Sequence, residues 1–271
     1  MKFHLPPKIK KISKAISVII LIVTVIAFWS IAVIMWFDDD SLVYGDCNVA
    51  KINLYGDLYT YIQENEECAD CSSSEEIVNQ IKDADANENI KAILLSIDSG
   101  GGWPTTGQEI ANALKRSEKP TVALIRDMGA SAAYFAASGA DRIFASDLSD
   151  VGSIGITMSY LDNVNKNQKE GLTFNQLSIG KYKDTGNSDK KLTKEEKDML
   201  IANLQTGYDI FVRNVAENRK LDIEKVKQLA DGNSMDGQKA LDNGLIDQLG
   251  DSFDVEKYLS DVIGEEAVVC R

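Results

Sequence analysis

The sequence predicts an α/β domain with a mostly parallel sheet, preceded by one transmembrane helix. The domain is predicted because short apolar segments with the character of strands alternate with helical patterns from residue 48 onward. This alternation favours a parallel sheet with helices on both faces. The transmembrane helix is predicted because residues 15–37 carry no charged side chain. The segment that follows, about 220 residues long, is ample for one hydrophobic core.

The transmembrane helix is the first expected element. At ~1.5 Å per residue, the 23 residues of 15–37 are long enough to span a ~30 Å hydrocarbon core. Five lysines and no acidic residue precede them, and three aspartates follow directly. The positive-inside rule therefore places the N-terminus in the cytoplasm. A cleavable signal peptide is the alternative, but the apolar run exceeds the ~7–15 residues of its hydrophobic region and no A-x-A site follows.

These features divide the chain into four parts. They are a cytoplasmic basic tail (1–14), the transmembrane helix (15–37), a linker (38–47) and an extracytoplasmic α/β domain (48–271), in a single-pass protein of the cell membrane. The part after residue 37 has a net charge of −18, because all 42 acidic residues but only 24 of the 29 lysines and arginines lie in it. A surface this acidic repels nucleic acid, which is excluded as a partner.

Within the domain, the spacing of apolar residues predicts strands and helices in turn. Residues 48–54 alternate apolar and polar side chains as a half-buried strand does, whereas 90–97 and 121–125 are apolar runs of strand length. Helical spacing with suitable caps falls between these strands. The remaining expected elements are helices at 74–84, 107–116 and 132–138 and a short strand at 142–145.

A long helix is predicted over residues 194–219. Thr193 and Glu196 have the spacing of a capping box, in which two side chains satisfy free backbone N–H groups at the start of a helix. Five apolar side chains then recur on one face of the helix: Leu204, Tyr208, Phe211, Val212 and Val215. This stripe belongs either to the core or to a subunit interface.

Four cysteines, Cys47, Cys68, Cys71 and Cys270, all follow the predicted membrane helix. In an oxidising compartment they form two disulfides in one of three connectivities. Cys68 and Cys71 have the spacing of a redox motif, but they lie in a polar run rather than at a strand-to-helix junction, so a local structural bridge is favoured. A zinc site would need all four to converge without help from histidine, and no metal is expected.

Two strand ends carry the residue types of an acyl-transfer site. The strand at 90–97 leads into three glycines, 100–102, and a backbone without Cβ can lie against a substrate carbonyl and donate an N–H to its oxyanion. The strand at 121–125 leads into Ser131 where a helix begins, at the positive end of the helix dipole. Taken alone, three glycines more often form a turn, and a serine between alanines is more often a packing residue.

The base that would activate Ser131 is not a histidine. The only histidine in the 271 residues is His4, which lies before the predicted membrane helix and so cannot reach Ser131. A Ser-His-Asp triad is therefore excluded, and lysine is the candidate base. A lysine base must be neutral, and since an ordinary lysine has a pKa near ~10.4, such a base has to be desolvated. Lys183 is the candidate, although by itself it would be a solvated loop lysine.

Five motifs follow one another along the chain. They are D-S-G-G-G after a strand, M-G-A-S-A-A-Y-F-A-A-S-G-A-D-R-I, V-G-S-I-G-I, G-K-Y-K-D and D-G-N-S-M-D-G-Q-K-A-L-D-N-G-L-I-D. In this order, and behind a membrane tether, they resemble the short, single-domain signal peptide peptidase A type of membrane-anchored serine protease over roughly residues 49–250. The resemblance implies a ClpP/crotonase-like fold and a serine endopeptidase that cleaves hydrophobic peptides, including signal peptides left in the membrane. It implies no cofactor.

The resemblance also assigns residues to the site. The nucleophile falls on Ser131 and the general base on Lys183, 52 residues later. The oxyanion donors fall on the N–H groups of Gly101 and Ala132, and Ser153 is placed to orient the lysine amine. Short members of the family assemble as rings in which neighbouring subunits can complete each dyad, so a homo-oligomeric ring is implied.

This sequence departs from the family pattern around the site. Gly100 and Asp98 replace a proline and an asparagine, and Ala132 and Ala133 replace the two glycines after the nucleophile. The added methyl groups are expected to narrow the approach to Ser131. A carboxylate at Asp98 would oppose an oxyanion if it pointed inward.

The choice of Lys183 over Lys181 depends on the resemblance. Both lysines follow the strand-like segment 173–179. In a continuing extended chain both would point to the same side as Leu177 and Ile179, so alternation does not separate them. The family pattern selects Lys183, because Asp184 follows it and Gly180 precedes it by three residues.

Two other classes of function remain open. A catalytically silent, membrane-tethered scaffold would keep the same glycines and the same apolar helix, but a serine-directed reagent would not label it. A crotonase-like enzyme of acyl-coenzyme A would share the oxyanion glycines, but the location outside the cell removes its cofactor.

Overall fold

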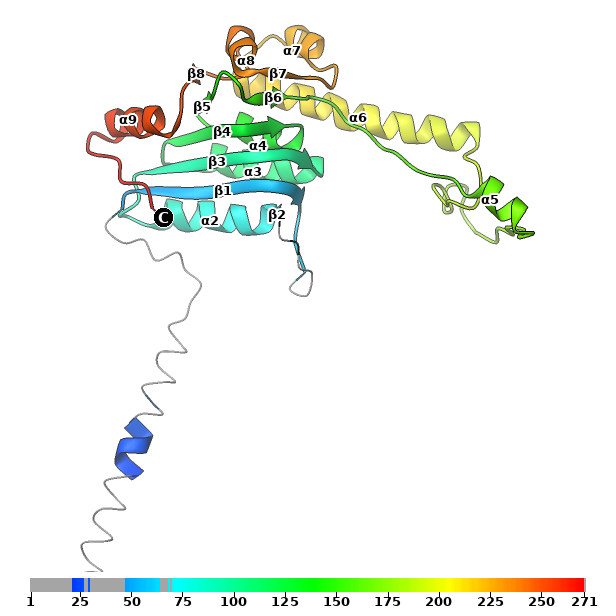
Figure 1. Ribbon diagram of the computed structural model, residues 1–271, viewed down its shortest axis with the longest axis horizontal. Helices are drawn as coiled ribbons and strands as arrows, with labels where there is room; N and C mark the ends of the chain where they lie inside the picture. The colour runs from blue at the N-terminus through cyan, green and yellow to red at the C-terminus, as the bar shows by residue number, and fades with distance from the viewer. Residues whose placement is uncertain (1–20, 27–28, 30–46, 64–67, 69, 271) are drawn as a thin grey trace, which may run out of the picture. The chain divides into compact units, whose positions relative to one another are not determined.

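The computed structural model describes residues 21–26, 29, 47–63, 68 and 70–270 (Figure 1). The chain divides into two units, Met1–Val43 and Tyr44–Arg271. In the first unit, residues 21–26 are helical. None of the helices in the described part of the chain combines the length and the apolar character needed to cross a bilayer.

Several predicted segments of the N-terminal region fall outside the described residues. They are the basic tail 1–14, most of the transmembrane span 15–37 and most of the linker 38–47. The transmembrane helix therefore stays a prediction.

The second unit is built on one sheet, which has eight strands among the described residues. Its strand order is β2-β1-β3-β4-β5-β8, with β6 beside β4 and β7 beside β6. Every pairing is parallel except the one between β6 and β7. The strands are β1 (Val49–Tyr59), β2 (Cys71–Ser73), β3 (Ala92–Gly102), β4 (Thr121–Ala130), β5 (Arg142–Ala145), β6 (Asp150–Gly152), β7 (Ser234–Asp236) and β8 (Gln248–Leu249). The predicted mostly parallel α/β architecture is confirmed.

Helices cover both faces of the sheet. On one face, α2, α3, α4 and the C-terminal half of α6 pack on the alternate apolar residues of β1, β3 and β4. On the other face, α9 packs through Val255 and Leu259. The helices are α2 (Ser74–Ala86), α3 (Pro104–Arg116), α4 (Ala132–Ser138), α5 (Val164–Lys169), α6 (Lys194–Arg219), α7 (Ile223–Leu229), α8 (Gly237–Asn243) and α9 (Ser252–Ile263).

The helices and strands predicted over residues 48–145 and 194–219 form, and three strands extend further than expected. Helices α4 and α6 and strand β5 begin and end where the sequence predicts, and α6 has the predicted Thr193–Glu196 capping box. Strand β3 continues through the glycines 100–102, of which Gly101 pairs with Asp57 and Gly102 with Leu58 of β1. The alternative interpretation of these glycines as a simple turn is therefore wrong.

An arm extends from the body of the second unit (Figure 1). We define it as residues 155–193 together with the N-terminal half of α6. No residue from 155 to 195 is buried. The strand expected at 173–179 does not form, because no neighbouring strand pairs with this segment, and Leu177 and Ile179 are both 99% exposed.

The apolar stripe of α6 lies partly in the core and partly along a cleft. Phe211, Val212 and Val215 are buried in the core, and the Phe211 ring stacks on Phe135 of α4 with 4.7 Å between centroids. Leu204, which belongs to the arm, and Tyr208, one turn further along the helix, are only half-buried and line a cleft. The part of the stripe near the C-terminus of the helix is thus core.

The cysteines form two disulfides, Cys47–Cys270 and Cys68–Cys71, which selects one of the three possible connectivities. The first ties the start of β1 to the C-terminal segment, where the Cys270 N–H also donates to the Val49 carbonyl at 2.9 Å. Because the partners are 223 residues apart, the bridge restricts the unfolded chain strongly, by ~5 kcal/mol in the chain-entropy account. The second is the local bridge that the sequence favours.

Candidate active site

Ser131 lies at the junction between β4 and α4, as the sequence predicts. Its φ of 53° and ψ of −124° are rare for a residue with a side chain. The backbone is held there on both sides, because the Ser131 N–H donates to the Gly152 carbonyl at 2.8 Å and the Ser131 carbonyl accepts the Phe135 N–H at 2.9 Å. The Ser131 hydroxyl does not cap α4, so no helix-capping bond prevents it from contacting a ligand.

Two residues at this site have strained backbone conformations. Among the described residues, the non-glycine residues with positive φ are Ser131, Ser153 and Lys220. Lys220 ends α6 in the ordinary left-handed cap conformation. The two serines line the same cleft. Such residues cost about 1–3 kcal/mol each and cluster at functional sites, so the strain marks this cleft as one.

The cleft beside Ser131 has a volume of about 990 Å³. The apolar and aromatic side chains that line it include Leu58, Tyr59, Trp103, Ile156, Leu204 and Tyr208. The charged side chains on its described wall are Asp57 and Asp231, both exposed. A concave, mostly apolar cleft of this size is typical of a ligand-binding site.

Gly101 lies directly against the predicted nucleophile. Its φ is 103°, and a Cβ at this position would lie 2.8 Å from Ser131 Cβ and 2.9 Å from the backbone nitrogen of Ala132. Only glycine fits such a close approach. The structure thus brings Gly101, Ser131 and Ala132 together. Ala132 is the first residue of α4, where a backbone N–H has no partner within the helix.

The Gly101 N–H is engaged by a residue that the sequence analysis missed. It donates to the Ser99 hydroxyl oxygen at 3.0 Å, and the Ser99 hydroxyl donates to the Gly56 carbonyl at 2.6 Å. Ser99 is 2% exposed. The feature of the sequence that could have identified Ser99 is a polar residue placed between an apolar strand and three glycines. In this conformation, therefore, an oxyanion has to compete with Ser99 for the Gly101 N–H.

The departures from the family pattern are accommodated. Ala132 and Ala133 are 1% and 0% exposed and pack in the core, so their methyl groups do not narrow the approach to Ser131, and that expectation is wrong. The Asp98 side chain is exposed and accepts the Met128 N–H on β4 at 3.3 Å.

Ser153 faces the cleft from the turn after β6. Its φ is 49°, its hydroxyl donates to the Gly232 carbonyl at 2.9 Å, and its N–H donates to the Asn233 carbonyl at 3.1 Å. Because Gly152 receives the Ser131 N–H, this turn is fixed to the predicted nucleophile. The V-G-S-I-G-I and D-G-N-S motifs therefore meet at one side of the cleft.

Lys183 is not brought to Ser131 within one chain. It is exposed on the arm, in a turn in which its N–H donates to the Gly180 carbonyl at 3.1 Å, and it does not line the cleft. Figure 1 shows the segment between α5 and α6 well away from the strand ends of the sheet. Lys181 lies on the same turn, with its amine 5.1 Å from the centre of the Tyr182 ring.

Known proteins are similar to this chain in fold and in sequence. A family model described as Peptidase family S49 matches residues 113–263, and one described as Clp protease matches residues 52–147. A mutant of ClpP1 from Listeria monocytogenes has the same fold, with a TM-score of 0.51 and 13% identity over 75% of this chain and 92% of that one. The fold is therefore ClpP-like, as the resemblance implies.

Two relatives extend over most of the chain. A provisionally named protease of Methanocaldococcus jannaschii is 30% identical over 91% of this chain and 82% of its own length. An Enterococcus faecium protein provisionally named signal peptide peptidase SppA is 30% identical over 82% of this chain and 68% of its own. The resemblance to SppA-type proteases is confirmed. Because the family match covers more than half of its length, the chain belongs to peptidase family S49.

Proposed function

We propose that this protein is a membrane-anchored serine endopeptidase that degrades hydrophobic peptides, such as residual signal peptides, with a Ser-Lys dyad of Ser131 and Lys183. The observation that carries the proposal is the geometry of Ser131, a strained serine at a strand-to-helix junction that faces an apolar cleft and lies against Gly101. The relative named as a signal peptide peptidase supports the substrate class.

The chemistry follows from these positions. Ser131 Oγ attacks the scissile carbonyl carbon while the neutral Lys183 amine takes the hydroxyl proton. The carbonyl oxygen becomes an oxyanion that the N–H groups of Ala132 and Gly101 stabilise, Gly101 exchanging its bond to Ser99 for this one. The resulting ammonium protonates the leaving amine. A water molecule, deprotonated by the lysine, then hydrolyses the acyl-enzyme.

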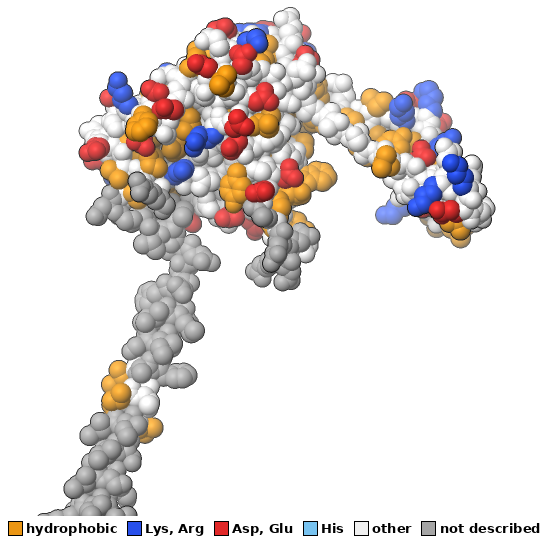
Figure 2. All heavy atoms as spheres, viewed as in Figure 1, with side chains coloured by type: hydrophobic (Ala, Val, Ile, Leu, Met, Phe, Trp, Pro, Cys, Tyr) orange, Lys and Arg blue, Asp and Glu red, His pale blue; other side chains and the backbone are white. Residues whose placement is uncertain are grey.

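In this proposal Lys183 reaches the cleft of a neighbouring copy. The arm that carries it exposes large apolar side chains, among them Leu161, Leu177 and Ile179, at 87%, 99% and 99%. Figure 2 shows such side chains on the arm beside several lysines. Exposed apolar surface of this kind is typical of a protein interface. A closed ring lets every arm be covered by the next subunit.

Charge supports the same arrangement. Residues 155–192 contain six lysines and four acidic residues, a net charge of +2 in a domain that is otherwise strongly acidic. The charged side chains that line the described wall of the cleft are aspartates, Asp57 and Asp231. A positive arm is therefore attracted to the cleft of a second copy.

The proposed location is the cell membrane, with the N-terminus in the cytoplasm and the protease domain outside. The uncharged segment 15–37 and the lysines before it support this orientation. The two disulfides support an oxidising compartment for the domain.

A covalent label tests the nucleophile. We expect a fluorophosphonate to form one adduct on the full-length protein, at Ser131, located by peptide mass spectrometry. Denatured protein serves as the control and should not react, because the reaction requires an activated hydroxyl. Failure of the native protein to react would favour the silent scaffold, and an adduct at another serine would move the nucleophile.

The pH dependence tests the base. A lysine acts as a base only when it is neutral, so peptidase activity is expected to rise from neutral toward alkaline pH as the amine loses its proton. Because the proposed mechanism uses no metal, activity should be the same with and without a chelator. The measurement is kcat/KM against pH for a fluorogenic hydrophobic peptide. An acidic optimum, or loss of activity in the chelator, would contradict the dyad.

A further inference from the structure

We propose that Glu196 is a positioning residue for Lys183, acting through a partly buried ionic cluster that fixes the loop presenting the lysine. The Glu196 cluster is defined here as Asp184, Thr185, Lys190, Thr193 and Glu196. This inference rests on the proposed role of Lys183 as the general base. It adds a residue that does not touch the substrate but decides where the base lies.

Glu196 is unusual among the charged residues of the chain. It lies in the first turn of α6 and is 3% exposed, and among the described residues it is the only charged one that is buried. A carboxylate is costly to bury unless it is paired and hydrogen-bonded. The contacts of Glu196 therefore show what this position does.

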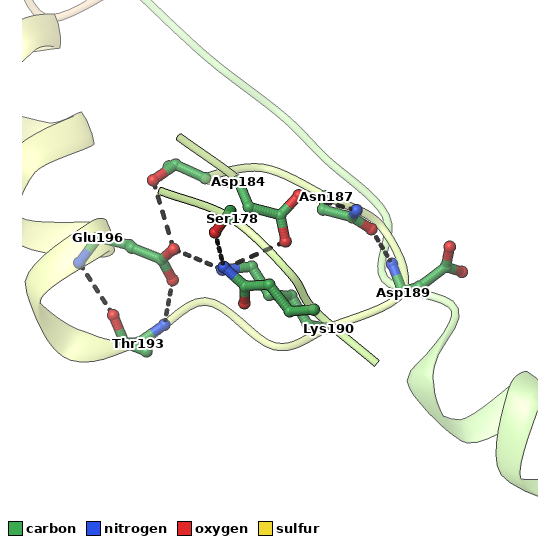
Figure 3. Close-up of polar contacts among 9 residues, drawn as sticks. Ser178, Asp184, Asn187, Asp189, Lys190, Thr193 and Glu196 are labelled. Atoms are coloured by element: carbon green, nitrogen blue, oxygen red, sulfur yellow. Dashed lines mark hydrogen bonds and ion pairs between the residues drawn. The ribbon is translucent and has the colours of Figure 1, made fainter. Parts of the chain in front are cut away.

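Both carboxylate oxygens of Glu196 bind the loop before α6 (Figure 3). Oε1 accepts the Lys190 ammonium at 2.6 Å and the Thr185 hydroxyl at 3.3 Å. Oε2 accepts the Thr193 N–H at 2.9 Å. One side chain thus connects residues 185, 190 and 193, which span the loop, to the start of the helix.

The cluster also holds the residue next to Lys183. The Asp184 carboxylate lies 3.9 Å from the Lys190 ammonium and accepts the Asn187 side-chain amide at 3.1 Å (Figure 3). Its side chain is 22% exposed. Lys183, one residue earlier, is exposed. Fixing Asp184 inward therefore fixes the backbone from which the Lys183 side chain leaves.

No apolar core holds this part of the arm. None of residues 171–195 is buried, and the large apolar side chains Leu177 and Ile179 point into solvent. The conformation of the loop therefore depends on its polar contacts, and Glu196, which is itself buried, makes three of them. Positioning matters for a base, because a misplacement of ~1 Å can cost ~10²-fold in rate.

The Glu196 carboxylate stays ionised over the whole pH range in which a neutral lysine can act as a base. The hydrogen bond from Lys190, followed by that from the Thr193 backbone, lowers the pKa of Glu196 to about 2. Because this pKa is lowered, the stabilisation is complete above the ordinary value near 4.5 and is lost as the pH falls through about 2. Titration of Glu196 therefore does not contribute to an alkaline rise in activity.

The test compares Glu196→Gln with Glu195→Gln in the full-length protein. Glutamine also serves in a capping box, so α6 should begin at the same residue, while the Lys190 ammonium loses its partner at 2.6 Å and keeps only Asp184, 3.9 Å away. We expect Glu196→Gln to lower kcat by about 10²-fold with KM within about threefold, since the cleft at Ser131 is untouched. The exposed Glu195, one residue earlier, is the matched control and should change kcat less than about twofold.

Two further variants decide the interpretation. Lys190→Gln removes the same ion pair from its other partner and should give the same loss of kcat, so it carries the test if Glu196→Gln does not fold. The double variant Glu196→Gln/Lys190→Gln removes both charges of the 2.6 Å ion pair, and Asp184 keeps its bond from the Asn187 side-chain amide, so it should recover at least about tenfold of the lost rate. Circular dichroism and light scattering establish that each variant is folded and assembled.

The base itself separates the two proposals. In a Lys183→Met background, Glu196→Gln should cause no further loss, because the residue it positions is gone. Equal kcat for Glu196→Gln and Glu195→Gln, or a full additional loss in the Lys183→Met background, would overturn the role of Glu196. Wild-type activity in Lys183→Met itself would instead overturn the proposed dyad, and would be visible without any change at Glu196.

Discussion

Replacing Ser131 with alanine is expected to lower kcat/KM for hydrophobic peptides by at least ~10⁴-fold. Alanine keeps the Cβ, so the backbone conformation at φ 53° and the bond from the residue 131 N–H to the Gly152 carbonyl should persist. Only the hydroxyl is lost. The residual rate would come from the backbone donors and from binding in the cleft. Hydrolysis of a fluorogenic peptide by the full-length enzyme measures the effect.

A second serine provides the control. Ser252 is the exposed first residue of α9, which packs on the other face of the sheet, so Ser252→Ala should leave kcat/KM within about twofold. Thermal unfolding of both variants should match that of the unmodified protein within a few degrees. If the Ser131 variant retained more than a few per cent of the activity while the control behaved as expected, another residue would be the nucleophile.

The elements that the sequence predicts best are those whose signals are local. Helix α6 has its own capping box and an apolar stripe, and α4 is a short apolar run between a serine and a glycine. These features act within a few residues of the chain, so they need no knowledge of the rest of the fold. The ends of β3 and β4 were missed because glycines and polar residues continue the ladder only where a neighbouring strand is already in place.

In the arm, the spacing of apolar residues did not predict the secondary structure correctly. Residues 173–179 are strand-like, with Leu177 and Ile179 two residues apart, but such a pattern gives a strand only if a sheet offers a free edge to pair with. The structure places this segment where nothing pairs with it, and both Leu177 and Ile179 are exposed. The same apolar residues that suggest a strand are, in our proposal, covered by another copy.

The candidate site was predictable in its residue types and not in its geometry. The place of Ser131 follows from a strand end and a helix start, which are local. The bond from the Gly101 N–H to Ser99 depends on how β3 packs on β1, and the separation of Lys183 from Ser131 depends on the direction of α6. Neither is encoded in the spacing of the motifs along the chain.

Replacing Lys183 with methionine is expected to lower kcat/KM by several orders of magnitude, about 10³-fold or more, because the nucleophile loses its base. Methionine keeps much of the stem and removes the charge. Lys181 lies two residues earlier on the same exposed turn, so Lys181→Met is the matched control and should change activity less than about tenfold. The reverse ranking would move the base to Lys181, and near-normal activity in both variants would leave the proposed mechanism without a base.

Mixing the two inactive variants tests whether the dyad forms between subunits. A Ser131→Ala subunit still carries Lys183 on its arm, and a Lys183→Met subunit still carries Ser131 in its cleft. If the arm of one copy completes the cleft of the next, co-assembly in equal amounts should restore about a quarter of the sites, the fraction expected from random neighbours in a ring. If each chain completed its own site, no mixture would recover activity. Because the arm holds Lys183 away from the cleft of its own chain, we expect recovery, and its absence in mixed assemblies would require the arm to fold back.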